Sequence, residues 1–194
     1  MTDRHSTLEE FWRRLDRREV EADLRTALRA RAARVEAPVL RVGKPATVVA
    51  FVEHVLPGSA VPAEVIAGFI ESAFDRPMGR GDERSGVLPR AELIPMGFRV
   101  LETAGERPFA GLPREQQAAV LQRAERGQVE GPQGFDSGLW FRRTRDLALI
   151  GYTSDPRGMV QMGYPGPSYR PGYVWLAYGG PEARNRRKPG HERY

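Results

Sequence analysis

The sequence contains no cysteine, which excludes disulfide bonds, thiolate metal sites and cysteine nucleophiles. Histidine is scarce as well, because only His5, His54 and His191 occur, far apart and without a histidine or carboxylate at ligand spacing. We therefore predict no metal site in this chain. His54 lies beside an apolar helical face, and we interpret it as a partly buried structural residue.

Long apolar runs are also missing. No window reaches the ~18 apolar residues that span a bilayer, and residues 1–34 are charged, without an apolar run of signal-peptide length. We therefore expect no direct membrane insertion. The expected location is the cytoplasm, and the alternative is the periplasm, reached together with a signal-bearing partner.

The sequence also contains none of the common catalytic motifs. The sequence has no Gly-x-Ser-x-Gly elbow, no phosphate-binding loop and no dinucleotide fingerprint after a strand. Carboxylate pairs such as Glu9–Glu10 and Asp82–Glu83 lie in charged surface segments. Because catalysis needs a positioned acid, base, nucleophile or metal, we favour a binding or structural protein without a cofactor of its own over a stand-alone enzyme.

The sequence does contain strong helical patterns. Apolar residues recur at helical spacing from Leu8 to Leu28 and predict one long or broken amphipathic helix over about residues 6–35. Pro45, Pro62 and Pro113 stand where helices begin, and further helices are expected over about residues 91–103 and 136–150, the last capped by Gly151. We predict an all-α fold, a compact bundle of about five to six helices.

Glycine and proline are abundant, with 21 and 16 residues, and they predict the irregular parts of the chain. Residues 75–86 are predicted to form a surface loop. Residues 152–180 are rich in Pro, Gly and aromatic residues and are expected to be a long irregular segment of a single helical domain, residues 1–180. The polar residues 181–194 predict a basic flexible tail.

The net charge of +5 permits a second interpretation, a small basic nucleic-acid-binding module that uses the first helix and the tail. Arg13, Arg14, Arg17 and Arg18 are interleaved with Glu and Asp, so their field is largely cancelled. Nucleic-acid binding is therefore the alternative, and we do not expect it.

Four sequence pieces in a fixed order carry a family resemblance: Val55-Leu-Pro-Gly58, the stretch from Arg107-Pro-Phe109 to Leu121, Phe135 to Pro156, and Met162-Gly-Tyr-Pro-Gly166. Over about residues 45–175 the chain resembles the gluconate 2-dehydrogenase subunit 3 family. It departs from the family pattern in two places. The Tyr-Gly-Gly-Asn usual after Ser-x-Pro is absent, and Met159 replaces a usual tryptophan.

The resemblance implies a function through a partner. Members of this family are helical small subunits of an FAD-dependent dehydrogenase, whose large subunit, of the glucose-methanol-choline class, holds the FAD and oxidises a sugar or alcohol. A cytochrome c subunit is present in some of these complexes. By this resemblance, the chain is a non-catalytic accessory subunit that binds and stabilises the catalytic subunit.

Aromatic residues of the C-terminal half are the candidate partner contacts, because Tyr and Trp are enriched at protein interfaces. The alternative for each is a place in the core of the chain itself. The candidate partner-binding residues are Trp140, Tyr152, Tyr164, Pro165, Tyr169, Tyr173 and Trp175.

Overall fold

The computed structural model describes residues 8–16, 22–33, 40–75, 88–105 and 107–164. These ranges contain helices and no strand, which confirms the predicted all-α class. The elements are α1 Leu8–Asp16, α2 Ala22–Ala32, α3 Pro45–Val55, α4 Ala63–Ala73, α5 Arg90–Thr103, the 3-10 turn η2 Phe109–Gly111, α6 Arg114–Glu125, α7 Ser137–Ser154 and α8 Pro156–Gln161.

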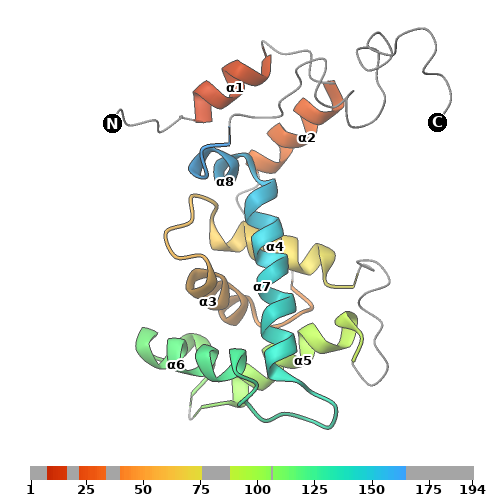
Figure 1. Ribbon diagram of the computed structural model, residues 1–194, viewed down its shortest axis with the longest axis vertical. Coiled ribbons are helices and arrows are strands. Elements are labelled where there is room, and N and C mark those ends of the chain that lie inside the picture. Colours follow the sequence, from red (N-terminus) through yellow and green to blue (C-terminus); the bar gives the residue numbers. More distant parts are fainter. Residues whose placement is uncertain (1–7, 17–21, 34–39, 76–87, 106, 165–194) are drawn as a thin grey trace, which may run out of the picture.

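The longest of these helices, α7, is the axis of the molecule (Figure 1). It contacts α3, α4, α5 and α6 along its length, and α8 follows directly at its C-terminal end. Helices α1 and α2 lie beyond α8, at the end of the molecule away from α5 and α6 (Figure 1). We call α3 to α7 the main body and the pair α1 and α2 the N-terminal hairpin.

Prolines begin most helices of the main body. Pro45 is the first residue of α3, and the prolines that precede α4, α5 and α6 occupy the N-cap position: Pro62, Pro89 and Pro113. Proline suits these positions because the first amides of a helix have no partner within it. Gly58 and Gly127 follow the ends of α3 and α6 with φ of 71° and 74°, a conformation that favours glycine. The predicted starts of these helices are confirmed to within one residue.

Two predicted boundaries were wrong. Helix α7 does not end at Gly151 but continues to Ser154. Gly151 is buried inside the helix, where a Cβ atom would lie 3.1 Å from the Phe69 ring, so the glycine permits close packing of α7 on α4. The irregular segment predicted from residue 152 instead contains the rest of α7 and the helix α8. With the predicted first helix divided into α1 and α2, the described ranges contain eight α-helices, against the five to six expected.

Other predicted features lie outside the described residues. They are most of the loop at 75–86, the predicted segment beyond residue 164 and the tail at 181–194.

An aromatic cluster forms the centre of the main body. The Phe51 ring centroid lies 5.7 Å from that of Phe98 and 5.5 Å from that of Trp140. The Trp140 side chain is 1% exposed, and its Nε1 donates a hydrogen bond to the Ile94 oxygen over 3.1 Å. Gly97 of α5 faces this indole so closely that a Cβ atom would overlap it. The glycine in α5 therefore makes room for the tryptophan of α7.

Two carboxylates hold the chain where it enters the main body. The buried Glu71 accepts hydrogen bonds from the backbone N–H groups of Arg41 and Val42, over 2.7 and 3.0 Å, and from Arg41 Nε over 2.6 Å. Hydrogen bonding to Glu71 and the charge of that residue raise the pKa of Arg41. Glu102 of α5 accepts from Lys44 Nζ over 2.8 Å and from the Thr47 hydroxyl. The segment before α3 is thereby fixed to α4 and α5.

The N-terminal hairpin has a small core of its own. Phe11 and Leu28 are buried, and partly buried apolar residues pack against them: Leu8, Trp12, Met159 and Val160. The Arg29 guanidinium of α2 binds both carboxylate oxygens of Asp16 at the end of α1. In one continuous helix these residues would lie about 20 Å apart. Of the two forms predicted for residues 6–35, the broken helix is therefore correct.

Candidate partner-binding surface

The turn after α3, which is distant in the sequence, meets α7 and α8 at the C-terminal end of α7. The Gln161 side chain of α8 connects them, because its Nε2 donates to the Gly58 oxygen over 2.7 Å and its Oε1 accepts from the Ala60 N–H over 2.7 Å. The Tyr152 hydroxyl of α7 donates to the same Oε1 over 3.1 Å. The turn after α3 is thus held against α7 and α8.

The turn from α7 into α8 is also tightly fixed. The buried Asp155 caps α8 by accepting from the Arg157 N–H, and its carboxylate pairs with the Arg157 guanidinium over 2.8 Å. Hydrogen bonding to Asp155 raises the pKa of Arg157, more than burial lowers it. A Cβ atom at Gly158 would overlap the Tyr152 carbonyl oxygen, so this close approach requires glycine. The turn between α7 and α8 is therefore held in one conformation by side-chain hydrogen bonds and close packing.

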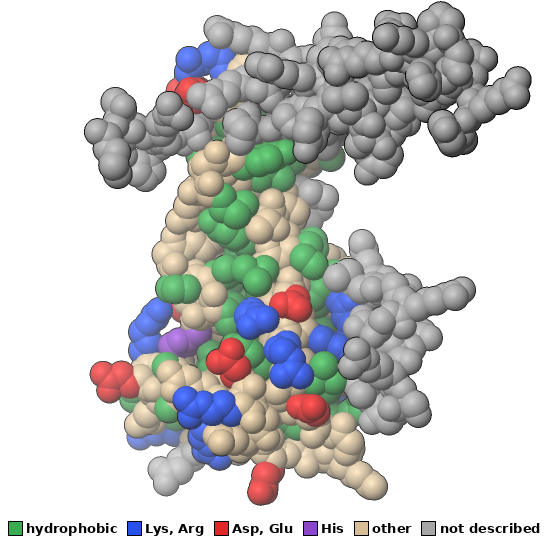
Figure 2. Space-filling view, in the orientation of Figure 1, with side chains coloured by type: hydrophobic (Ala, Val, Ile, Leu, Met, Phe, Trp, Pro, Cys, Tyr) green, Lys and Arg blue, Asp and Glu red, His purple; other side chains and the backbone are tan. Residues whose placement is uncertain are grey.

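This end of the molecule carries the exposed large apolar side chains of the described residues. Their exposed fractions lie between 37% and 49%: Leu149 39%, Ile150 37%, Met162 49% and Tyr164 42%. Figure 2 shows hydrophobic side chains along the upper part of the visible face, where α7 and α8 lie, and charged side chains over its lower part. We call these four residues the apolar end surface.

The predicted contact residues are divided among three locations. Trp140 belongs to the core of the main body and offers no surface to a partner. Tyr152 is half-buried and bonded to Gln161, and Tyr164 belongs to the apolar end surface. The remaining candidates lie outside the described residues: Pro165, Tyr169, Tyr173 and Trp175.

The aromatic criterion missed three residues of the surface, Leu149, Ile150 and Met162. For Leu149, the periodicity of the buried residues of α7 would have indicated an exposed position. Its buried face includes Trp140, Thr144, Leu147 and Gly151 at three- and four-residue steps, and Leu149 falls between these positions.

A family model supplies the decisive comparison. The model for gluconate 2-dehydrogenase subunit 3 matches residues 43–173, which is most of the chain. The chain belongs to the gluconate 2-dehydrogenase subunit 3 family. No significant match was found among curated proteins or solved structures. Family membership confirms the predicted resemblance and makes the chain a relative of a dehydrogenase subunit.

The residues that match the family model include α3 to α8 and the whole apolar end surface. Its Leu-Pro-Gly turn at residues 56–58 and Tyr152 of α7 are brought together by hydrogen bonds to Gln161. The N-terminal hairpin lies outside the matched residues.

Hollows also lie on the surface of the main body. A groove of about 270 Å³ between α3, α6 and α7 is lined by His54, Phe141 and Arg145 among others. The His54 Nε2 lies 2.8 Å from the Gln117 oxygen, so His54 joins α3 to α6, as a structural histidine does. A second hollow, of about 310 Å³, lies beside the turn after α3 and is lined in part by Glu53 and Arg114.

Two further features, a metal site and a membrane-spanning helix, have no candidate in the described ranges. No group of three or more His, Asp or Glu residues there is arranged to hold a metal ion. None of the helices described combines the length and the apolar character that a membrane crossing requires.

Proposed function

We propose that this chain is the non-catalytic small subunit of an FAD-dependent dehydrogenase of the glucose-methanol-choline class, and that it binds and stabilises the catalytic subunit. Membership in a family of gluconate 2-dehydrogenase subunits supports this proposal. The observation that carries it is the apolar end surface, where the exposed large apolar side chains are gathered within residues 149–164.

The exposed side of α7 changes character along the helix. Arg142 and Asp146 are exposed in its first part, whereas Leu149 and Ile150 are exposed toward its end. Contact surfaces between subunits are poor in charged residues at their centre and rich in Met and aromatic residues. The end of α7 has this composition, with Met162 and Tyr164 following α8, and the beginning of α7 does not.

In this proposal the two subunits divide the work. The FAD and the hydride chemistry belong to the catalytic subunit, and a cytochrome c subunit accepts the electrons if the complex contains one. The small chain stabilises the folded catalytic subunit because a partner that binds only the folded form shifts the unfolding equilibrium. Covering the apolar end surface stabilises the small chain in return.

Capture from the native host tests the proposal. The tagged chain is expected to retain a flavoprotein at fixed stoichiometry, recognised by its flavin absorption spectrum, and a haem spectrum would reveal the cytochrome subunit. Fractionation of the cells before capture distinguishes the expected cytoplasmic complex from a periplasmic one. Recovery of the chain alone, or with nucleic acid that leaves as salt is raised, would refute the proposal.

A pair of variants tests the surface itself. Ile150→Asp places a charge in the apolar end surface, and Ala119→Asp places the same charge on an exposed position of α6. We expect Ile150→Asp to weaken retention of the flavoprotein by at least about tenfold, because a buried unpaired charge is costly. Ala119→Asp should bind as the unchanged chain does. Equal retention by both variants would place the interface elsewhere.

A further inference from the structure

The N-terminal hairpin covers part of the family-matched region. The residues matched to the family begin at Gly43, so α8 lies inside the match and the hairpin outside it. Met159 and Val160 of α8 pack against the hairpin core of Phe11 and Leu28. A segment outside the matched residues therefore occupies one face of α8.

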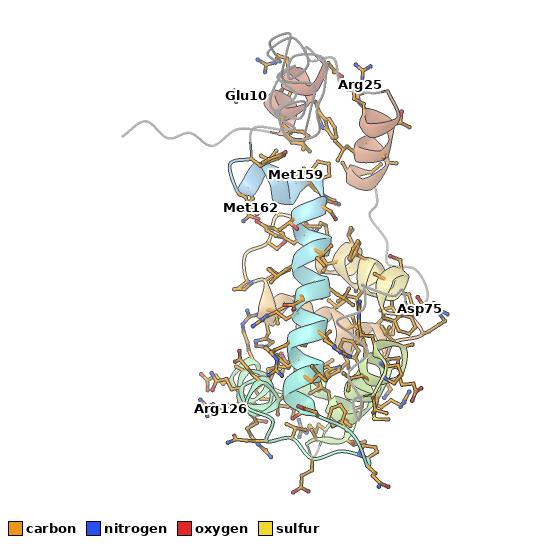
Figure 3. The ribbon with its side chains drawn as sticks, turned by 45° about the vertical axis from the view of Figure 1, so that its right-hand side comes forward. Glu10, Arg25, Asp75, Arg126, Met159 and Met162 are labelled. Atoms are coloured by element: carbon orange, nitrogen blue, oxygen red, sulfur yellow. The ribbon has the colours of Figure 1, made fainter. Side chains whose placement is uncertain are left out.

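The covered and uncovered faces of α8 adjoin each other. The Tyr164 N–H donates a hydrogen bond to the Met159 oxygen over 2.8 Å, which places the exposed Tyr164 beside the covered residue. In Figure 3 Met159 lies on the side of α8 toward the hairpin, and Met162 lies on the side away from it. Removal of the hairpin would extend the apolar end surface across Met159 and Val160.

The two helices of the hairpin are tied to each other and are weakly attached to α8. Its helices have 9 and 11 residues, too short to be stable alone. They are tied to each other by Arg29, which pairs with Asp16 over 2.9 Å and lies 5.5 Å from the Trp12 ring centroid. Among the described side chains, its core contains the buried Phe11 and Leu28, and α8 contributes the half-buried Met159 and Val160 to it.

Two carboxylates hold the connection to the main body. Glu71 binds Arg41 and Val42 through three hydrogen bonds, nine residues after the end of α2, and Glu102 binds Lys44 and Thr47. Departure of the hairpin from α8 therefore leaves the entry into α3 in place.

We propose that the N-terminal hairpin is a displaceable cover of α8, which shields Met159 and Val160 in the free chain and yields this face to the catalytic subunit. This inference rests on the proposed function, since it names part of the surface that the same partner takes. The flexible Met159 side chain suits a face that changes its neighbour, because methionine adapts to differently shaped surfaces.

The first test measures affinity for the flavoprotein purified by capture from the host. Phe11→Ala weakens the hairpin core without altering α8, and Thr26→Ala removes an exposed side chain of the same hairpin as the control. A displaceable cover predicts several-fold tighter binding by Phe11→Ala and no change for Thr26→Ala. Unchanged binding by Phe11→Ala overturns the inference, and weaker binding does so by showing that the hairpin contributes to the interface.

The second test follows the hairpin directly. Because the chain has no cysteine, Leu28→Cys and Ala27→Cys each introduce a single thiol, one buried in the hairpin core and one exposed. Saturation with the flavoprotein should raise the maleimide-labelling rate of Leu28→Cys at least about tenfold and leave that of Ala27→Cys unchanged. A complex without this rise overturns the cover alone, whereas the absence of any complex overturns the proposed function together with it.

Discussion

Phe51 in the main body and Phe11 in the N-terminal hairpin are almost equally buried, with exposed fractions of 0% and 2%. Their surroundings differ. Phe51 lies against Phe98, Trp140 and Phe141, from two other helices of a large core. Among the side chains that the structure describes, Phe11 shares its cluster with one other buried residue, Leu28. The burial of a single side chain therefore does not reveal how much structure depends on it.

The polar anchors of the two regions show the same contrast. Glu71 of the main body is buried and accepts three hydrogen bonds, two of them from backbone N–H groups. The hairpin is tied by Arg29 and Asp16, whose side chains are about half exposed, and such surface pairs contribute about 0–1 kcal/mol. We infer that the hairpin opens at a lower free energy than the main body unfolds.

The largest predicted effect comes from replacing a buried phenylalanine by alanine, once in the main body and once in the hairpin. Phe51→Ala should destabilise the main body by about 3–5 kcal/mol, because it leaves a cavity among packed rings. Phe11→Ala should change the global free energy of unfolding by less than about 1 kcal/mol, because the hairpin opens separately. Denaturant unfolding measures both values, and hydrogen exchange resolved by peptide assigns each change to its region. An equal cost for the two substitutions would abolish the distinction between the regions.

A smaller effect tests the close packing of the main body. Gly97→Ala should cost about 1–3 kcal/mol, because the added methyl overlaps Trp140, which is fixed by its hydrogen bond to Ile94. Gly111→Ala is the control, since a Cβ atom there meets nothing within 4 Å. Thermal unfolding should show a lower midpoint temperature for Gly97→Ala than for Gly111→Ala. Hydrogen exchange in the hairpin should be unchanged in both variants. A stable Gly97→Ala variant would mean that Trp140 can move aside.

The success of sequence reasoning on the main body has a local cause. Proline and glycine act on their own backbone, so Pro45, Pro62 and Gly127 mark helix boundaries whatever packs against them. The fold class and the bounds of α3 to α6 follow from such signals. The role of Gly151 does not, because it depends on Phe69 of another helix, and this contact cannot be inferred from neighbours in the sequence.

The hairpin and the candidate surface were harder to predict. The sequence between Asp16 and Ala22 contains neither Gly nor Pro, so no helix-ending residue type indicates that α1 and α2 are separate helices. Aromatic content suggested Trp140 as a contact, but aromatic residues serve cores and interfaces alike. What separates Trp140 from Tyr164 is the phase of the helix and the packing of its neighbours, which the residue type does not reveal.

The anchor between the two regions gives the third prediction. Glu71→Gln keeps the shape of the side chain but replaces one acceptor oxygen by an NH₂ group that faces N–H donors. We expect a loss of about 1.5–3 kcal/mol, as for hydrogen bonds to charged groups, with faster exchange at Arg41 and Val42. The exposed Glu64→Gln in the same helix should stay within about 0.5 kcal/mol of the unchanged chain. Exchange in the hairpin should be unchanged, and an increase would show that its docking depends on the anchor.

The smallest effect is a pH dependence of the main body that arises from Glu102. Burial alone would raise the pKa of Glu102, but hydrogen bonds from Lys44 and Thr47, together with the Lys44 charge, leave it below the ordinary value. The unfolded chain therefore binds the proton more readily than the folded chain. The stability from Glu102 is complete above the ordinary glutamate pKa of about 4.3 and is lost as the pH falls through the lower folded pKa.

Denaturant unfolding from pH 6 down to pH 3 measures this contribution by comparing the unchanged chain with Glu102→Gln. The variant should be less stable at pH 6, and the difference should shrink below about pH 4.3, where the carboxylate becomes protonated. Glu130→Gln, which removes an exposed carboxylate from the loop before α7, should show no such convergence. A difference between the unchanged chain and Glu102→Gln that does not change with pH would mean that the ionisation of Glu102 does not contribute to stability.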